Sequence, residues 1–194
     1  MDYAKNILNV LSQATEGELI DGAAWYTVAK HECKQIADRY ELPLHIVVGV
    51  VAALSPTNKW ERNLVDADAL CGAYVSGDYV ESVKVCTYKT MRGKAWSILQ
   101  DNPNKEDTRA YLRGPKITDF YDCILGVDTC VIDGHAWCIA NGDRRTMQEV
   151  PNIGKKLRAD LQQAYRDVGK QGDLPAYVVQ AITWVVWRRI YNIS

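Results

Sequence analysis

The sequence predicts an all-α protein. Apolar residues recur at helical spacing along most of the 194 residues, strand-like alternation is scarce, and the six prolines fall between the periodic segments. The clearest helical patterns cover residues 3–14, 22–40, 43–54, 58–75, 90–100, 115–125, 134–141, 154–168 and 175–191. We therefore expect about nine helices.

Several of these segments have a physical reason to begin where they do. Pro43 and Pro175 suit the first turn of a helix, because that turn leaves its N–H groups without helical partners. Asp21 and Asp133 each precede a helical segment, where a carboxylate can accept hydrogen bonds from those N–H groups. Residues 177–187 are apolar nearly all round, which predicts the central helix of the core.

Composition restricts the class of protein. The 47% hydrophobic content is typical of a globular chain, and no apolar run reaches the roughly 18 residues of a membrane helix. The polar N-terminal segment does not fit a signal peptide, so we expect a cytoplasmic monomer that does not bind membranes. The six cysteines form no CxxC pair, which predicts buried free thiols, no metal site and no cofactor.

The charge balance limits how the chain could bind nucleic acid. Its formal net charge is −1, so bulk electrostatic attraction to DNA is not expected. Any DNA contact has to come from local clusters of basic residues and from backbone N–H groups.

The segment at residues 112–137, LRGPKITDFYDCILGVDTCVIDGHAW, is the most informative about function. It contains a Gly-Pro-Lys turn, a helix-length stretch, a second turn, and Ile-Asp-Gly-His at the start of another helix. A glycine turn before a helix exposes N–H groups that can bind a phosphate, and the helix dipole favours the anion. Asp133 is expected at the mouth of the second helix.

This segment resembles the core of the helix-hairpin-helix DNA glycosylase superfamily, which includes endonuclease III and 8-oxoguanine glycosylase. Those proteins carry G-x-K in a hairpin, then a helix, then φ-D-x-H. Gly114-Pro115-Lys116 matches the first motif, and residues 132–135 match the second. Lys116 precedes Asp133 by 17 residues, close to the usual span in the family. The cysteines that bind the iron–sulfur cluster are absent, so the chain resembles the branches without a cluster.

Two upstream stretches agree with the resemblance in order and distance. Residues 47–63, VVGVVAALSPTNKWERN, resemble the helix and polar turn that line the base pocket, and residues 87–99 resemble the Y-x-x-K-A-x-x-I helix. The resemblance implies one glycosylase-like domain over residues 1–194, with two lobes sharing a cleft. Its core would be residues 47–141, and residues 1–46 and 142–194 would form the packing lobe.

The resemblance also implies roles for individual residues. Asp133 would stabilise positive charge on the sugar as the base leaves, and Lys116 would attack the sugar C1′ to give a Schiff base and strand cleavage. The partner would be duplex DNA with one nucleotide flipped out of the stack. The residues expected to line the base pocket are Thr57, Asn58, Trp60, Tyr88, His135 and Trp137.

The hairpin allows two alignments. The one that keeps Lys116 places Leu112 where the family has its first glycine, whereas the other places Thr118 at the lysine position and shortens the span to 15 residues. A second hairpin, VPNIGKK at residues 150–156, resembles the generic DNA-binding hairpin. The expected phosphate contacts from both hairpins are Gly114, Pro115, Ile153, Gly154, Lys155 and Lys156.

Three functions fit the pattern. The first is a DNA N-glycosylase for a damaged or modified base, with or without lyase activity. The second is a phage-type enzyme that alters hypermodified pyrimidines in DNA without releasing a base. The third is a non-catalytic helix-hairpin-helix DNA-binding module, in which Asp133 only caps a helix and His135 is a capping or core residue.

Overall fold

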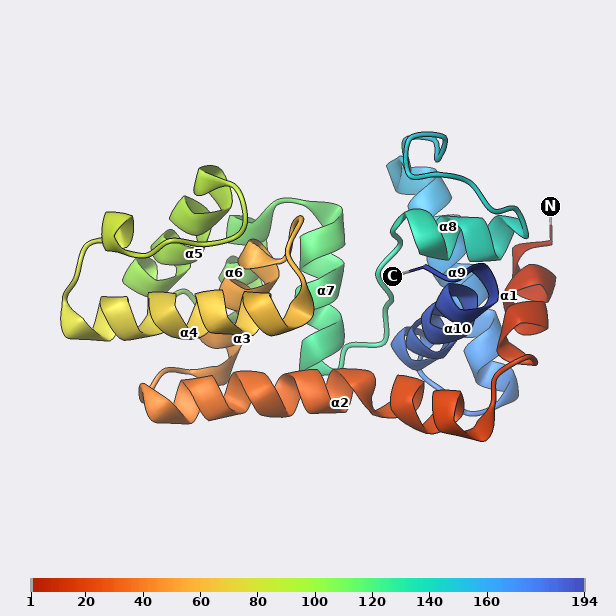
Figure 1. The fold of residues 1–194 in the computed structure, drawn as a ribbon, viewed down its shortest axis with the longest axis horizontal. Coiled ribbons are helices and arrows are strands. Elements are labelled where there is room, and N and C mark those ends of the chain that lie inside the picture. The colour runs from red at the N-terminus through yellow and green to blue at the C-terminus, as the bar shows by residue number, and fades with distance from the viewer. Residues whose placement is uncertain (1, 194) are drawn as a thin grey trace. The chain divides into compact units, whose positions relative to one another are not determined.

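The computed structural model describes residues 2–193, and within that range every regular element is helical (Figure 1). The elements are α1 (Tyr3–Leu11), α2 (Glu16–Arg39), α3 (Leu44–Leu54), α4 (Trp60–Ser76), the 3₁₀ turn η1 (Val80–Ser82), α5 (Lys89–Asp101), α6 (Lys105–Leu112), α7 (Pro115–Leu125), α8 (Gly134–Asn141), α9 (Lys155–Gln171) and α10 (Ala176–Tyr191). The predicted all-α class is confirmed.

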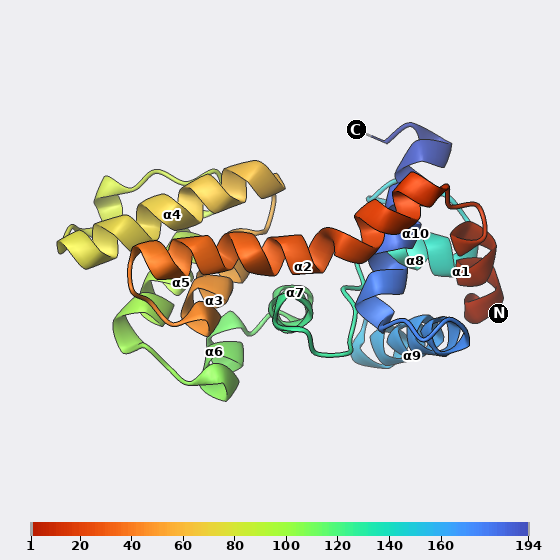
Figure 2. The same ribbon diagram turned by 90° about the horizontal axis from the view of Figure 1, so that it is seen from below.

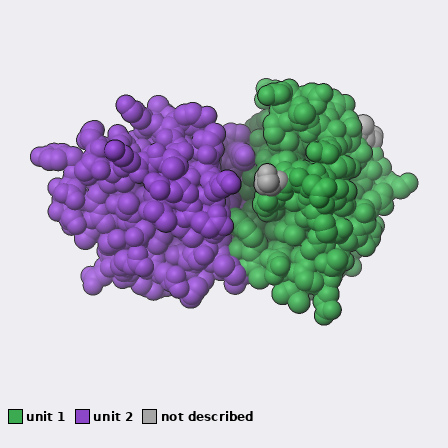
Figure 3. Space-filling model, viewed as in Figure 1, with its two compact units in different colours: residues 1–26, 126–194 green, residues 27–125 purple. Residues whose placement is uncertain are grey.

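The chain divides into two compact units (Figure 3). Unit 1 consists of residues 1–26 and 126–194, and unit 2 consists of residues 27–125. Unit 1 therefore combines segments from both ends of the chain, whereas unit 2 is continuous in sequence. The first part of α2 belongs to unit 1 and the remainder to unit 2.

Unit 2 is built around α3. Every residue from Ile46 to Leu54 is buried, and α4, α5, α6 and α7 pack against the helix. A helix that is apolar on all sides has to be covered on all sides, which explains its central place. Gly49 allows α6 to come close, since a Cβ at this position would lie 2.7 Å from Thr108 Cγ2.

Unit 1 is built around α10, as the apolar sequence of residues 177–187 predicts. Figure 2 shows α1, α8 and α9 gathered around this helix, and all three contact it. Gly22 in α2 packs directly on its backbone, because a Cβ there would lie 2.6 Å from Ile182 Cα. Each unit thus has its own central helix, where the sequence pattern indicated one.

The pattern misses α6, which has no apolar stripe. Only Thr108 and Leu112 are buried in its sequence KEDTRAYL. Its start is fixed by a local bond instead: Asn104 Oδ1 accepts a hydrogen bond from Asp107 N at 2.9 Å. Helix periodicity cannot detect a short helix that buries two side chains.

The predicted start of α2 is also wrong. The helix begins at Glu16, six residues before the expected start, because Thr15 and Glu18 cap each other. Thr15 N donates to Glu18 Oε2 at 2.9 Å, and Glu18 N donates to Thr15 Oγ1 at 3.3 Å. Asp21 therefore lies inside the helix and does not cap it.

All six cysteines are free thiols, and five of them are buried. Burial raises the pKa of the Cys33 and Cys71 thiols to about 12, so both are protonated at neutral pH. Cys86 is exposed, against the prediction of buried thiols. Within residues 2–193, no helix has the length and apolar character needed to cross a membrane.

An ion pair between Glu18 and Arg189 joins α2 to α10 within unit 1. Arg189 Nε lies 2.6 Å from Glu18 Oε1, and Arg189 Nη2 donates to Gln13 O at 2.8 Å. The hydrogen bond from Arg189 lowers the pKa of Glu18 from 4.5 to about 2. The stability from the pair is therefore full above pH 4.5 and is lost as the pH falls toward 2.

The melting temperature should fall less between pH 4.5 and 2 in Glu18→Gln than in the unmodified protein, because the variant has no carboxylate at this position to protonate. Circular dichroism melts across this range measure the effect, and Glu16→Gln, an exposed change in the same helical turn, is the control. An acid slope in Glu18→Gln equal to that of the unmodified protein would contradict the assignment.

Candidate functional site

Asp133 stands directly before α8 and caps it, as predicted. Its Oδ1 accepts a hydrogen bond from Ala136 N at 2.9 Å, and its backbone oxygen accepts one from Trp137 N at 3.0 Å. The preceding residue, Ile132, is buried, whereas Asp133 is half-buried, so the carboxylate sits where the chain leaves the core of unit 1. Within residues 2–193 the structure gives the Asp133 carboxylate one hydrogen bond, which Oδ1 accepts.

The second predicted hairpin, residues 150–156, lies near Asp133. A Cβ on Gly134 would lie 2.5 Å from Met147 Sδ and 3.6 Å from Val150 Cγ2, so a glycine here lets the loop before the hairpin pack onto the start of α8. Arg158, in the first turn of α9, donates to Ile132 O at 3.2 Å. Unit 1 therefore brings the start of α9 next to the start of α8.

The N-terminus of α9 presents donors and cations to solvent. Gly154 is the N-cap, and the first helical bond runs from Arg158 N to Gly154 O, so the three N–H groups between them have no helical acceptor. Lys155 and Lys156 are exposed, and Lys156 pairs with Asp160 at 2.9 Å, an exposed contact that contributes little. The predicted contact Ile153 packs against the core.

His135 and Trp137 lie on α8 but differ in exposure. His135 is half-buried, and no hydrogen bond joins it to Asp133. Trp137 is 6% exposed and belongs to the core of unit 1, and the Arg145 guanidinium lies 5.3 Å from its ring centroid. In this conformation Arg145 covers the ring, so stacking on a base would require Arg145 to move.

The first predicted hairpin is the turn between α6 and α7 in unit 2. Arg113 takes the left-handed conformation (φ +57°), and Gly114 N donates to Leu112 O at 2.7 Å. Leu112, at the place of the family's first glycine, is fully buried and anchors the turn. Pro115 is the first residue of α7 and lacks an N–H, so this helix start offers fewer donors than that of α9. Lys116 is exposed.

Lys94, which the sequence analysis did not select, holds this turn. Its Nζ donates to Leu112 O, the last carbonyl of α6, at 2.5 Å. Burial and the positive charge of Arg113 lower the pKa of Lys94. A signal was present, because Lys94 is the lysine of the K-A-x-x-I stretch that resembles the glycosylase helix.

Thr57 and Asn58 lie in the turn between α3 and α4. Thr57 is exposed and left-handed (φ +58°). Asn58 is half-buried, and its Nδ2 donates to Asp66 Oδ2 at 3.0 Å. Asp66 is a second residue that the sequence analysis did not identify.

Trp60 and Tyr88 take different positions in unit 2. Trp60 is half-buried, with its Nε1 donating to Glu32 Oε2 at 2.9 Å and its ring meeting Phe120 edge to face at 6.1 Å. Phe120 follows Lys116 by one turn of α7, so the two share a helix face. Tyr88 is exposed before α5.

The predicted residues therefore fall into two sets. Unit 1 contains Asp133, His135, Trp137, Ile153, Gly154, Lys155 and Lys156, and unit 2 contains Thr57, Asn58, Trp60, Tyr88, Gly114, Pro115 and Lys116. Across residues 2–193, no group of three or more His, Cys, Asp or Glu side chains is placed to hold a metal ion.

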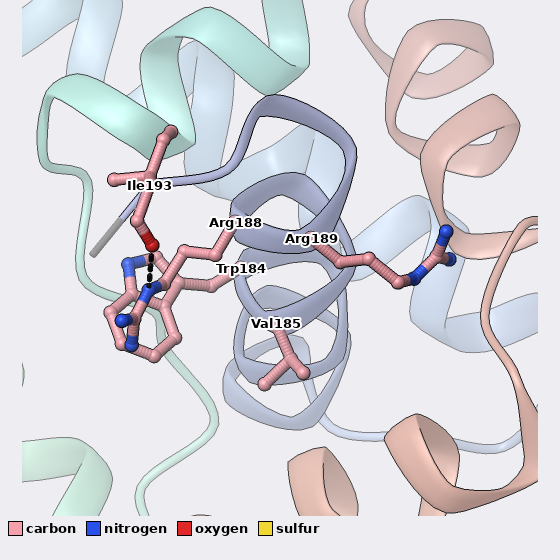
Figure 4. Close-up of a pocket in the computed structure, with 5 residues that line it drawn as sticks. All are labelled: Trp184, Val185, Arg188, Arg189 and Ile193. Carbon is pink, nitrogen blue, oxygen red and sulfur yellow. Dashed lines mark hydrogen bonds between the residues drawn. The ribbon is translucent and has the colours of Figure 1, made fainter.

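An open pocket of about 220 Å³ lies at the C-terminal end of α10 (Figure 4). The Arg188 guanidinium stacks 4.6 Å from the centroid of Trp184, and Arg188 Nε donates to Ile193 O at 3.0 Å. Arg189, on the opposite side, is bound to Glu18. None of the residues predicted from the sequence lines this pocket.

The comparisons place the chain in a family. Residues 1–190 match the model of a family of unknown function (DUF7178), and the chain belongs to this family. No curated protein and no solved structure matches the chain.

The cap at Asp133 predicts a stability effect that is separate from any activity. We expect Asp133→Ala to lower the free energy of unfolding by about 1 kcal/mol, because Ala136 N loses its acceptor. Asp133→Asn keeps an oxygen in place and should lose less. Urea unfolding followed by circular dichroism measures both, and an Asp133→Ala variant as stable as the unmodified protein would show that the cap contributes nothing.

Proposed function

We propose that the chain is a DNA N-glycosylase that removes a damaged or modified base, with Asp133 as its catalytic carboxylate. The observation that carries the proposal is the position of Asp133: it is half-buried at the N-terminus of α8, and one carboxylate oxygen is fixed by Ala136 N. A carboxylate that is already oriented can stabilise the positive charge that develops on the sugar as the glycosidic bond breaks. It can also accept a proton from an attacking water.

The start of α9 supports DNA as the substrate. With a net charge of −1, the chain has to hold phosphates through local groups. The first turn of α9 combines N–H groups that have no helical acceptor with the two exposed ammonium groups of Lys155 and Lys156, and Arg158 ties this helix end to the residue before Asp133. The resemblance of residues 112–137 to the glycosylase core is the second line of support.

Lys116 is the proposed nucleophile for a lyase step. Its exposed amine would attack C1′, so that the N–C1′ bond forms as the glycosidic bond breaks and the base leaves with the electron pair. The nitrogen then loses a proton, and the sugar C1′–O4′ bond breaks, with O4′ taking up a proton, to give the protonated Schiff base. Loss of a C2′ proton then expels the 3′ phosphate and cleaves the strand. The proposal assigns Thr57, Asn58 and Tyr88 to contacts with the flipped base.

We expect Asp133→Asn to reduce base release by about 100-fold or more while DNA binding is retained, because the variant keeps the cap and loses the charge. The assay incubates duplexes carrying uracil, oxidised purines or hypermodified pyrimidines and measures free base by mass spectrometry. Asp167→Asn, an exposed change on α9, is the control. An altered nucleoside without free base, or no turnover with any duplex, would contradict the glycosylase proposal.

We expect borohydride to trap a covalent adduct between the protein and DNA with an abasic site, and Lys116→Ala to abolish it. Gel electrophoresis detects the adduct, and Lys105→Ala, an exposed lysine at the start of α6, is the control. An adduct that persists in Lys116→Ala would remove the lyase role from Lys116, and Lys94→Met would be the next variant. Base release does not depend on this result.

A further inference from the structure

The turn between α3 and α4, residues 55–59, is held in a strained conformation. Thr57 is β-branched, yet its φ of +58° lies in the left-handed region, which such residues avoid. The residue is exposed, so burial of its own side chain does not offset the strain. Such a conformation persists only where the surrounding structure enforces it.

Asp66 is the centre of the contacts that enforce it. Its carboxylate, fully buried in α4, accepts hydrogen bonds from Asn58 Nδ2 at 3.0 Å, from Arg62 Nε at 2.7 Å and from Cys86 N at 2.7 Å. Thr87, next to Cys86, donates from its hydroxyl to Pro56 O at 2.7 Å. The turn is thereby tied to α4 and to the segment before α5.

Burying the Asp66 carboxylate costs folding free energy, which its hydrogen bonds have to offset. A buried carboxylate lowers stability unless donors surround it, and of the three donors to Asp66 only Arg62 lies in α4 itself. The other two contacts reach out of the helix to loop residues. The Oδ1 atoms of Asn58 and Asn63 are buried without a partner in the described part of the chain, which adds to the unfavourable terms at this place.

We propose that Asp66 is the positioning residue of the candidate base pocket. Its carboxylate holds Asn58, and through it the strained turn, so that Thr57 and Asn58 meet a nucleotide in one fixed geometry. Asp66 is buried and does not touch the substrate. The activity part of this inference rests on the proposed function, whereas the thermodynamic part does not.

A double-mutant cycle tests whether Asp66 enforces the strain. Thr57→Gly removes the steric strain and should raise the melting temperature by about 2–4 °C. Asp66→Asn should lower the melting temperature. Adding Thr57→Gly to Asp66→Asn should then raise the melting temperature by less than half as much as Thr57→Gly alone does, because the turn has already relaxed. Asp68→Asn is the control, because Asp68 lies on the same helix as Asp66 but pairs with Arg39 of α2 at the surface. It should leave the rise in melting temperature from Thr57→Gly unchanged.

Additive effects of Thr57→Gly and Asp66→Asn would overturn the proposal. If Asp66→Asn does not fold, Asn58→Ala takes its place in the cycle, because it removes the side chain through which Asp66 reaches the turn. The same two outcomes then apply.

The kinetics of base release distinguish a positioning role of Asp66 from a purely structural one. At a temperature where all variants are folded, Asp66→Asn should lower kcat by about 10- to 100-fold while the KM for DNA changes little, because a misplaced turn affects alignment more than binding. Asp68→Asn should match the unmodified protein. An unchanged kcat in folded Asp66→Asn would refute the positioning role, whereas absence of base release from the unmodified protein would refute only the proposed function.

Discussion

Each unit depends on the burial of the apolar residues of one central helix. Residues 46–54 of α3 and most residues in the middle of α10 are buried, and exposing them to water would lower stability, since burying a Val, Leu or Ile side chain contributes about 1.5–3 kcal/mol. The neighbouring helices therefore have to surround them. Gly49 lies on α3 where α6 packs closely, and Gly22 lies on α2 where α2 packs closely on α10. Both glycines therefore serve the burial of the central helices.

Within this apolar frame, buried and half-buried polar side chains hold two of the turns. Asp66 holds the turn after α3, and Lys94 holds the turn after α6. Asp122 is buried beside Arg109 at 2.9 Å, and burial raises the pKa of its carboxyl while the guanidinium opposes that change. A buried group that loses its partner costs more than the bond itself contributes, so the contacts of Asp66 and Asp122 are strong restraints on the segments that they join.

The positive charges of unit 1 are held in defined places. Arg144, Arg145 and Arg188 each lie over an aromatic ring, at 4.9, 5.3 and 4.6 Å from the ring centroid. A stacked guanidinium keeps its charge and loses much of its freedom. A chain with a net charge of −1 can thus present ordered local cations, which is the electrostatic arrangement that the proposed contact with DNA requires.

The sequence by itself determined the helical class, the bounds of α7 and α8, and the cap at Asp133, because periodicity and capping act between residues within one or two turns. It missed α6, whose two buried side chains give no pattern. Only the tertiary structure decided that Asp66 binds Cys86 and that Lys94 binds Leu112, partners 20 and 18 residues away. Contacts at that distance depend on how helices pack, which no local pattern encodes.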